Sequence, residues 1–556
     1  MSQLNVEQAM ALPLRAGAWR RFAKSETGSL TIFALCLFML MVMIGGVAVD
    51  LMRYEAMRTS LQNTLDRATL ASASLTQRLN PRDVVTDYFD KAGLSEYLTS
   101  VTVDQGMNYR EVVADARAAT NPFFMHLIGI DEMDAPGRSQ AEQRMTNVEI
   151  VLVLDVSGSM DTNNRLVNLK SAAKEFVNTV LSADTENRIS IAIVPFNGQV
   201  NLGANLRQRF NFTDDHNVTD VNCIDLPASV YSTTGISTTL ALPMTAHADT
   251  YSGTTRNSSY YAWSDSANGT VIAGNRWCPP STANTVMLPS RSITGLQAKI
   301  DSLTAIGATS INAGMKWGMT LIDPGSRNVI NHFINTGTVP GIFAGRPFDY
   351  TDPEAMKVVV LMTDGDHFAE ERVKQPYKVG PSPIYKSPND GNYSIRFTTG
   401  RPSIAGTNEY WVPHLGTWRA LPWTNSTNTG ASTLQPLTWP QVWSQVRLQW
   451  VVWQLYARAL GTTDAQRSTQ YTNWVEAFRE QTVIGTMNNQ LQQICSLARA
   501  NDVTVYGIAF EAPPGGQTQI AQCATSSAHY FQAAGLQIST VFRSIASNIT
   551  QLRLTQ

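Results

Sequence analysis

The chain has 556 residues and a net charge of −2, and only 15% of its side chains are charged. A nucleic-acid-binding protein would carry a basic face, which this charge balance argues against. The length exceeds one ordinary domain, so we expect roughly two to four. Apolar residues make up 43% of the chain, which is ample for a core, while Ser, Thr, Asn and Gln are plentiful. That composition is typical of a protein outside the cytoplasm.

A basic N-terminal segment, residues 1–29, precedes the uncharged apolar run Leu30–Val49. A run of this length can cross a bilayer as one helix. Positive residues stand before the run, and the charges after it balance. We therefore expect a transmembrane helix at 30–50, with the N-terminus in the cytoplasm and the bulk of the chain in the periplasm. A cleaved signal peptide is the alternative, but its apolar region is usually shorter and is closely followed by small residues.

Residues 51–146 are expected to form a helical stalk and a small α+β module. The helical period continues to about Leu79, a short helix follows at 83–92, and alternating stretches at 98–104 and 109–114 can pair as a hairpin. The apolar stretch 121–129 is predicted to be a helical turn that plugs the small core, with His126 packed inside it.

A second pattern begins where a buried strand ends. The apolar run 150–154 is followed by Asp155, Ser157 and Ser159 in a D-x-S-x-S arrangement. One carboxylate and two hydroxyls are hard oxygen ligands, which suit Mg²⁺, Mn²⁺ or Ca²⁺. Sites in open α/β sheets lie at the carboxyl edge of the strands. Alone the pattern is weak, because Asp and Ser after a strand also cap the next helix.

Two distant stretches add similar side chains. The stretch 307–314 places Thr309 at the start of a helix, and the apolar strand 357–363 ends at Asp364. The order D-x-S-x-S, G-x-T, strand-T-D-G resembles the von Willebrand factor A domain. The resemblance implies a metal-ion-dependent adhesion site that leaves Mg²⁺ (or Mn²⁺ or Ca²⁺) an open position for a partner's carboxylate. Its ligands here would be Asp155, Ser157, Ser159, Thr309 and Asp364.

Strands alternate with helices over 147–556, which predicts an α/β fold with a doubly wound parallel sheet. The resemblance stated above implies that this fold is von Willebrand factor A-like. Two stretches break the pattern and are predicted insertions, at about 211–289 and 367–483. The first is rich in Ser, Thr, Asn and Gly. The second is rich in Pro and Trp, and most of its tryptophans are expected to fill its own core.

Five cysteines are present, and Cys36 lies in the apolar run. The other four indicate two disulfides formed in an oxidising compartment, with four buried thiols as the alternative. We expect a Cys223–Cys278 bridge to pin the first insertion. We expect a second bridge, Cys495–Cys523, to join two consecutive helices.

Gly28 precedes the apolar span, Asp50 closes it, and an alanine-rich helix carries Leu61, Gln62 and Asp66. This stretch resembles the N-terminal segment of TadG-like proteins of the tight-adherence (Flp) pilus assembly system. The resemblance implies an inner-membrane protein that binds pilus assembly proteins or pilins. Pilins of that system carry a glutamate five residues after the processing glycine, where this chain has Phe33. That difference argues against processing into a pilus subunit.

The sequence contains no P-loop, H-E-x-x-H or G-x-S-x-G motif, so we do not expect an enzyme. Asp366 and His367 lie beside Asp364, which keeps a metal-dependent hydrolase as a minor alternative. A surface adhesin that binds host or glycan ligands through the insertions is the other alternative.

Overall fold

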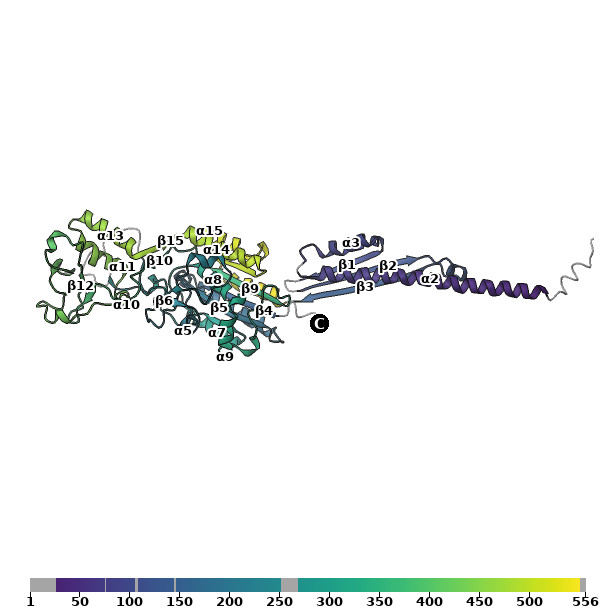
Figure 1. Ribbon diagram of the computed structural model, residues 1–556, viewed down its shortest axis with the longest axis horizontal. Helices are drawn as coiled ribbons and strands as arrows, with labels where there is room; N and C mark the ends of the chain where they lie inside the picture. The colour runs from purple at the N-terminus through teal and green to yellow at the C-terminus, as the bar shows by residue number, and fades with distance from the viewer. Residues whose placement is uncertain (1–26, 76, 106–108, 145–146, 252–268, 551–556) are drawn as a thin grey trace, which may run out of the picture. The chain divides into compact units, whose positions relative to one another are not determined.

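The computed structural model describes residues 27–550 apart from 76, 106–108, 145–146 and 252–268. Most of the N-terminal segment expected in the cytoplasm therefore lies outside the described residues. The chain divides into two compact units, residues 1–144 and 145–556 (Figure 1). Each unit is described by itself.

The first unit is built along one helix, α2 (Thr27–Ala73). It is long and apolar enough to cross a membrane, and its apolar part is exposed to the surroundings. The helix ends at Ala73 and not near Leu79 as predicted. Helix α3 (Pro81–Ala92) follows. A three-stranded antiparallel sheet of β1 (Leu98–Gln105), β2 (Tyr109–Thr120) and β3 (Met133–Arg144) then packs against α2, so the predicted hairpin forms.

The connection between β2 and β3 contradicts the sequence prediction. Residues 121–129 do contain a helical turn, η2 (Met125–Ile128), but the turn does not plug the core. Leu127 is 69% exposed. His126 is also exposed, and its Nδ1 lies 2.8 Å from a carboxylate oxygen of Asp131. The small core is formed instead by the α2, α3 and β2 side chains around Leu65 and Phe89.

The second unit is centred on a six-stranded sheet in the order β17-β16-β9-β4-β5-β8. Its strands are β4 (Asn147–Asp155), β5 (Ile189–Phe196), β8 (Met287–Ser290), β9 (Ala355–Thr363), β16 (Thr504–Phe510) and β17 (Tyr530–Ala533). The predicted α/β class is confirmed. The sheet is mixed, however, because the edge strand β8 runs antiparallel to β5. Strand β8 comes from the end of the stretch that was predicted to be the first insertion.

Helices cover both faces of this sheet, because the central strands are apolar on both sides. One group packs together through α8 (Ile311–Ile322), α14 (Ile484–Ala500) and α15 (Pro514–Cys523). The other comprises α4 (Arg165–Ser182), α7 (Ile293–Ser302) and α16 (Gln537–Thr550). With helices on both faces, the sheet is doubly wound. Helix α9 (Arg327–Asn335) follows α8 in the chain and precedes β9.

The stretch between β5 and β8 is mostly irregular. It contains α5 (Gly203–Arg207) and the short paired strands β6 (Phe212–Thr213) and β7 (Leu242–Pro243). The Cys223–Cys278 disulfide crosses it, as predicted. The Cys495–Cys523 disulfide also forms and ties α14 to α15.

The stretch between β9 and α14 has a hydrophobic core of its own. Strands β10 (Glu370–Val373) and β15 (Arg479–Thr482) pair at its base. A four-stranded sheet follows, of β11 (Ile384–Lys386), β12 (Tyr393–Arg396), β13 (Tyr410–Val412) and β14 (Thr417–Arg419). Its helices are α10 (Trp439–Gln445), α11 (Leu448–Trp450), the π-helix η11 (Val451–Ala457), α12 (Arg458–Leu460) and α13 (Asp464–Phe478). The buried tryptophans are Trp411, Trp418, Trp423, Trp439, Trp443, Trp450 and Trp453. They fill the interior, as expected.

Candidate functional site

The two predicted carboxylates lie together because β4 and β9 are adjacent parallel strands. Leu154 pairs with Met362, so both strands end at the same level of the sheet. The hydroxyl of Thr363 donates a hydrogen bond of 2.6 Å to Asp155 Oδ2. The backbone N–H of Ser157 donates to Asp155 Oδ1 at 2.8 Å. These bonds fix the Asp155 carboxylate, which is fully buried, at the carboxyl edge of the sheet.

The two serines of the first loop reach toward the second carboxylate. Ser159 Oγ donates to Asp364 Oδ1 at 2.8 Å, and Ser157 Oγ lies 3.5 Å from the same oxygen. The two serine hydroxyls are 3.1 Å apart. Four of the five predicted ligands therefore form one connected cluster.

The loop that carries Thr309 is joined by backbone hydrogen bonds to the loop that carries Ser157 and Ser159. The N–H of Gly158 donates to the carbonyl of Gly307 at 2.9 Å, and the N–H of Ile306 donates to the carbonyl of Val156 at 2.9 Å. Gly307 has a φ of +91°, a conformation that favours glycine. This arrangement places Thr309 with Ser157 and Ser159 in the wall of one cavity of about 300 Å³. All five predicted side chains thus lie at one edge of the sheet.

The site concentrates negative charge away from water. Burial, with repulsion from Asp364, raises the pKa of Asp155 to about 7. Burial also raises the pKa of Asp364, although hydrogen bonds from Ser159 and Arg165 oppose the rise. Two carboxylates in such surroundings favour a bound cation, which would stabilise their ionised forms.

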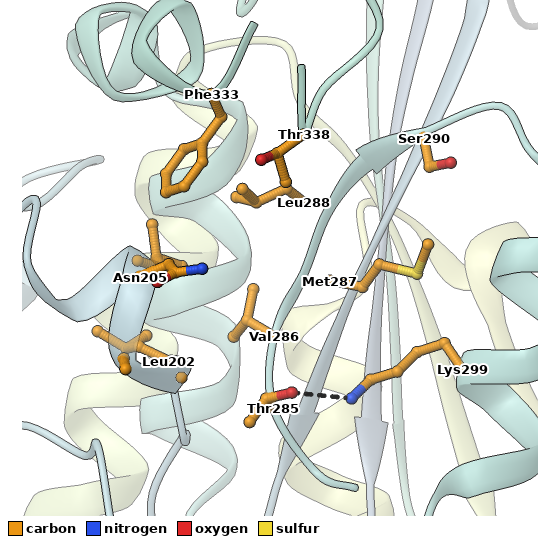
Figure 2. Close-up of a pocket in the computed structure, with 13 residues that line it drawn as sticks. Leu202, Asn205, Thr285, Val286, Met287, Leu288, Ser290, Lys299, Phe333 and Thr338 are labelled. Carbon is orange, nitrogen blue, oxygen red and sulfur yellow. Dashed lines mark hydrogen bonds between the residues drawn. The ribbon is translucent and has the colours of Figure 1, made fainter. Parts of the chain in front are cut away.

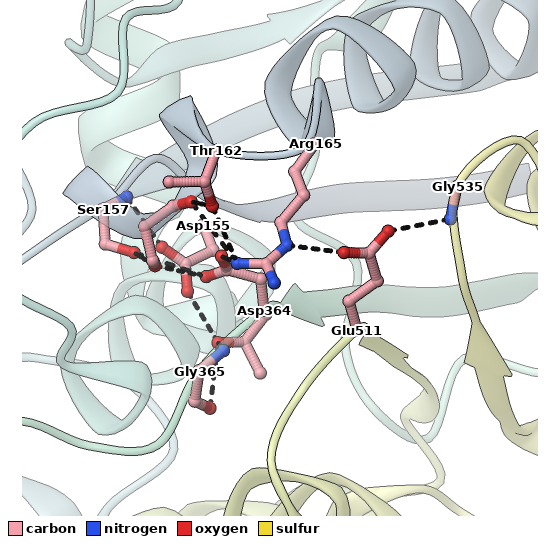
Figure 3. A network of polar contacts seen from close by, with 10 residues as sticks. Asp155, Ser157, Thr162, Arg165, Asp364, Gly365, Glu511 and Gly535 are labelled. Atoms are coloured by element: carbon pink, nitrogen blue, oxygen red, sulfur yellow. Dashed lines mark hydrogen bonds and ion pairs between the residues drawn. The ribbon is translucent and has the colours of Figure 1, made fainter.

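The sequence pattern did not single out Arg165, whose guanidinium supplies a positive charge at the site. Arg165, at the start of α4, lies between Asp364 and Glu511 (Figure 3). Its Nη1 is 2.9 Å from Asp364 Oδ2, and its Nε is 2.9 Å from Glu511 Oε2. Glu511 is held in turn by the backbone N–H of Gly535 at 2.9 Å. Arg165 therefore balances part of the charge of the cluster.

The donor set fits a hard divalent cation. Among the described residues, no group of three or more His, Cys, Asp and Glu side chains could hold a metal ion. A cation here would therefore draw on the hydroxyls of Ser157, Ser159 and Thr309 beside the two carboxylates. Oxygen ligands of this kind suit Mg²⁺ or Ca²⁺ better than a metal that prefers thiolate.

His367 is engaged elsewhere and does not face the cluster as a free base. Its Nε2 accepts the backbone N–H of Asn312 at 3.0 Å, and its Nδ1 lies 2.7 Å from Asn488 Oδ1. Burial lowers the pKa of His367 to about 4, so the ring is neutral at physiological pH. The geometry gives no support to a hydrolytic role for this histidine.

A second cavity, of about 400 Å³, lies beside the edge strand β8 (Figure 2). Its wall includes Leu202, Leu288 and Phe333, and Lys299 contributes the charged group. Lys299 Nζ donates to the carbonyl of Ala283 at 2.6 Å and lies 3.1 Å from Thr285 Oγ1. The amine is thus occupied by the protein, and none of the predicted ligands lines this cavity.

One known protein family matches the N-terminal helix. Residues 28–75 match the family described as "Putative Flp pilus-assembly TadE/G-like". This TadE/G-like stretch covers most of α2 and leaves the second unit outside the match. A comparison with curated proteins found no match.

Solved structures with some similarity include pilus proteins. The von Willebrand factor domain of the type V pili tip protein Mfa5 from Porphyromonas gingivalis has a TM-score of 0.30 and 13% identity, over 73% of this chain and 96% of that one. The pilus adhesin SpaC from Lactobacillus rhamnosus GG has a TM-score of 0.29 and 10% identity, over 81% of this chain and 33% of that one. Proximal thread matrix protein 1 from the mussel byssus, with a zinc-occupied MIDAS motif, has a TM-score of 0.26 and 11% identity, over 74% and 50%. Similarities this low leave the function to be argued from the site.

Proposed function

We propose that this chain is a membrane-anchored protein of Flp pilus assembly, which binds partner proteins through a divalent cation at the carboxyl edge of its sheet. The TadE/G-like match at residues 28–75 supports the pilus-related role and the anchor. One observation carries the cation site: three separate loops bring the five side chains together. Ser157, Ser159 and Thr309 line one cavity. Asp155 and Asp364 are hydrogen-bonded to the two serine residues behind it.

In this proposal Ser157, Ser159 and Thr309 face the cavity and would hold the cation, and the two carboxylates lie behind them. A bound Mg²⁺ supplies exchangeable coordination positions, one of which an acidic side chain of a partner can take. The aromatic side chains of Trp277 and Phe368 also line the cavity. They offer an apolar wall to the aliphatic part of that acidic side chain.

The alternative of a surface adhesin had its sequence support in the tryptophan-rich insertion. Tryptophans that bind a ligand by stacking must expose a face, and those of this insertion are mostly buried. An inner-membrane protein that faces the periplasm therefore remains our proposal, with pilins or other pilus assembly proteins as its partners.

The cation site is tested with Mg²⁺ alone and the variant Asp155→Asn. Mg²⁺ at 100 times its Kd should stabilise the wild type by about 2.7 kcal/mol, seen as a rise in Tm in detergent solution. Asp155→Asn keeps the size of the side chain and removes one carboxylate. We expect the variant to fold, because it also removes a buried charge, and to lose the Mg²⁺-dependent rise.

The matched control is Asp349→Asn, which makes the same change at an exposed side chain that pairs with Arg327. This variant should keep the full Mg²⁺-dependent rise in Tm. EDTA should abolish that rise in both the wild type and Asp349→Asn. A wild type whose Tm is unchanged by Mg²⁺, Mn²⁺ and Ca²⁺ would contradict the proposed site.

A further inference from the structure

The turn between β2 and β3 exposes a cluster of apolar side chains. Phe123 is 68% exposed, Leu127 69% and Ile128 52%. Residues 121–130 contain no lysine or arginine, and the first acidic residues are Asp131 and Glu132 at the start of the return. Such a cluster on a hairpin tip marks an interaction surface.

The turn is fastened to α2 at one place. The Asp50 carboxylate accepts three backbone N–H groups: Phe123 at 2.9 Å, Phe124 at 2.6 Å and Met125 at 2.9 Å. Asp50 is buried beneath the turn. Three bonds to one carboxylate hold the turn rigidly at this level of the helix.

Phe124 reaches further along the helix, toward its apolar run. A Cβ built on Gly46 would lie 2.2 Å from Phe124 Cγ, so the ring occupies the space that a side chain would need. Gly46 precedes Asp50 by one helical turn, about 6 Å along the axis. The turn therefore overlaps the last part of the apolar run that ends at Val49.

The surface of α2 beside the turn is also apolar, and an arginine follows it. Val49, Leu51 and Met52 are exposed on α2 at this level. The Arg53 guanidinium lies 4.3 Å from the centre of the Phe123 ring. Arginine at the end of an apolar helix reaches lipid headgroups while its stem stays in apolar surroundings.

From this we propose that residues 121–130 enter the bilayer interface beside the transmembrane part of α2. The occupant of this surface is lipid, because its apolar side chains are continuous with those of a helix that crosses the membrane. The inference rests on the proposed membrane anchor. It gives the first unit a second membrane contact, which restrains the tilt and rotation of the helix. Since the turn has no lysine or arginine and His126 lies beside the carboxylate of Asp131, the contact is mainly apolar and does not require anionic lipid.

The test uses the full chain in phosphatidylcholine vesicles, with an environment-sensitive fluorophore at single cysteines. The reporter is Leu127→Cys in a Cys36→Ser background, and Ile128→Cys is a second reporter. Both sites are exposed, so neither change disturbs the core. We expect a blue-shifted emission that is mostly quenched by lipid carrying a nitroxide near the headgroup and little affected by aqueous iodide.

Two controls separate the possible outcomes. Thr86→Cys, exposed on α3, should be quenched by iodide and not by lipid. Cys36, labelled in the wild type, should be quenched by lipid carrying a deep nitroxide, since it is exposed within the apolar run. Lipid-quenched Cys36 with iodide-quenched Leu127→Cys and Ile128→Cys would overturn the inference and leave the anchor intact. Iodide-quenched Cys36 would overturn both.

Discussion

At the scale of single residues, Arg165 is the feature that sets the candidate site apart from a simple oxygen cluster. Its side chain is 16% exposed and bonds to Asp364, one of the two carboxylates that a cation would need. A positive charge so close to the cluster competes electrostatically with a divalent cation. Arg165 is therefore expected to stabilise the cation-free protein and to weaken cation binding.

The variant Arg165→Ala should bind Mg²⁺ more tightly. Loss of a partly screened charge is worth about 1 to 2 kcal/mol, a factor of roughly 5 to 30 in the binding constant. The same variant should have a lower Tm without Mg²⁺, because the Asp364 charge is then unbalanced. Calorimetric titration with Mg²⁺ measures the first effect and thermal unfolding in EDTA the second.

The control for this prediction is Arg543→Ala, which removes an arginine that pairs with Glu175 at an exposed position. It should leave Mg²⁺ affinity unchanged. Weaker binding by Arg165→Ala would mean that the arginine organises the site more than it opposes the cation.

His367 gives a prediction about pH. Its pKa is about 4 in the folded protein, against 6.5 for an ordinary histidine, because the ring is buried. The unfolded chain therefore binds more protons between these two values, and stability falls as pH drops through that range. From pH 7.5 to pH 5 the contribution lost is about 2 kcal/mol.

Asp155 acts in the opposite direction, since its raised pKa favours the folded state as pH falls, so the histidine must be isolated by difference. Denaturant unfolding of the wild type and of His367→Gln, both in EDTA, gives the two pH profiles. We expect the wild type to lose about 2 kcal/mol more than the variant between pH 7.5 and pH 5. Parallel profiles would contradict this account of His367.

Among the residues of the site, the sequence predicted those whose proximity follows from a short local pattern. Asp155, Ser157 and Ser159 follow a strand within five residues, so their proximity could be predicted. Arg165 and Glu511 are 346 residues apart, and only the fold brings them together. His126 was misassigned because an apolar run usually indicates burial, whereas this run is exposed on a hairpin tip.

At the scale of elements, the central strands were predictable because continuous apolar runs distinguish them. Strand β8 was not, because Met-Leu-Pro-Ser is short and ends a polar stretch. Pro289 in this strand is compatible with an edge position, where a missing N–H costs no ladder bond. The antiparallel direction of this edge strand therefore could not be predicted from the sequence.

Helix α8 lies between the sheet and α14 and is buried along its whole length. Its close approach to β4 depends on glycine, because a Cβ built on Gly318 would lie 2.5 Å from Val153 Cγ2. Gly318→Ala should lower the free energy of unfolding by about 1 to 3 kcal/mol, since overpacking outweighs the gain in helix propensity. Denaturant unfolding of the full chain measures the change.

The matched control is Gly485→Ala in α14, where a Cβ meets nothing within 4 Å. That change should stabilise by about 0.4 to 1 kcal/mol, because alanine restricts the unfolded chain. Equal effects of the two substitutions would argue against close packing of α8 on the sheet.

At the scale of the whole molecule, the two units carry different tasks in the proposed function. The first contains the apolar helix and the TadE/G-like match, and the second contains the candidate cation site. The long stretch between β9 and α14 has a separate hydrophobic core and was recognisable from sequence only by its composition. Its buried tryptophans account for that composition without a ligand.

The remaining prediction concerns membrane topology. It decides between a periplasmic assembly protein and a surface adhesin. Basic residues before the apolar run predict a cytoplasmic N-terminus. With an epitope at each end of the chain, protease added to intact cells should remove neither. Protease added to spheroplasts should remove the C-terminal epitope and spare the N-terminal one. Loss of the C-terminal epitope from intact cells would favour the adhesin, because only a surface-exposed domain is accessible there. Loss of the N-terminal epitope alone from spheroplasts would reverse the predicted orientation.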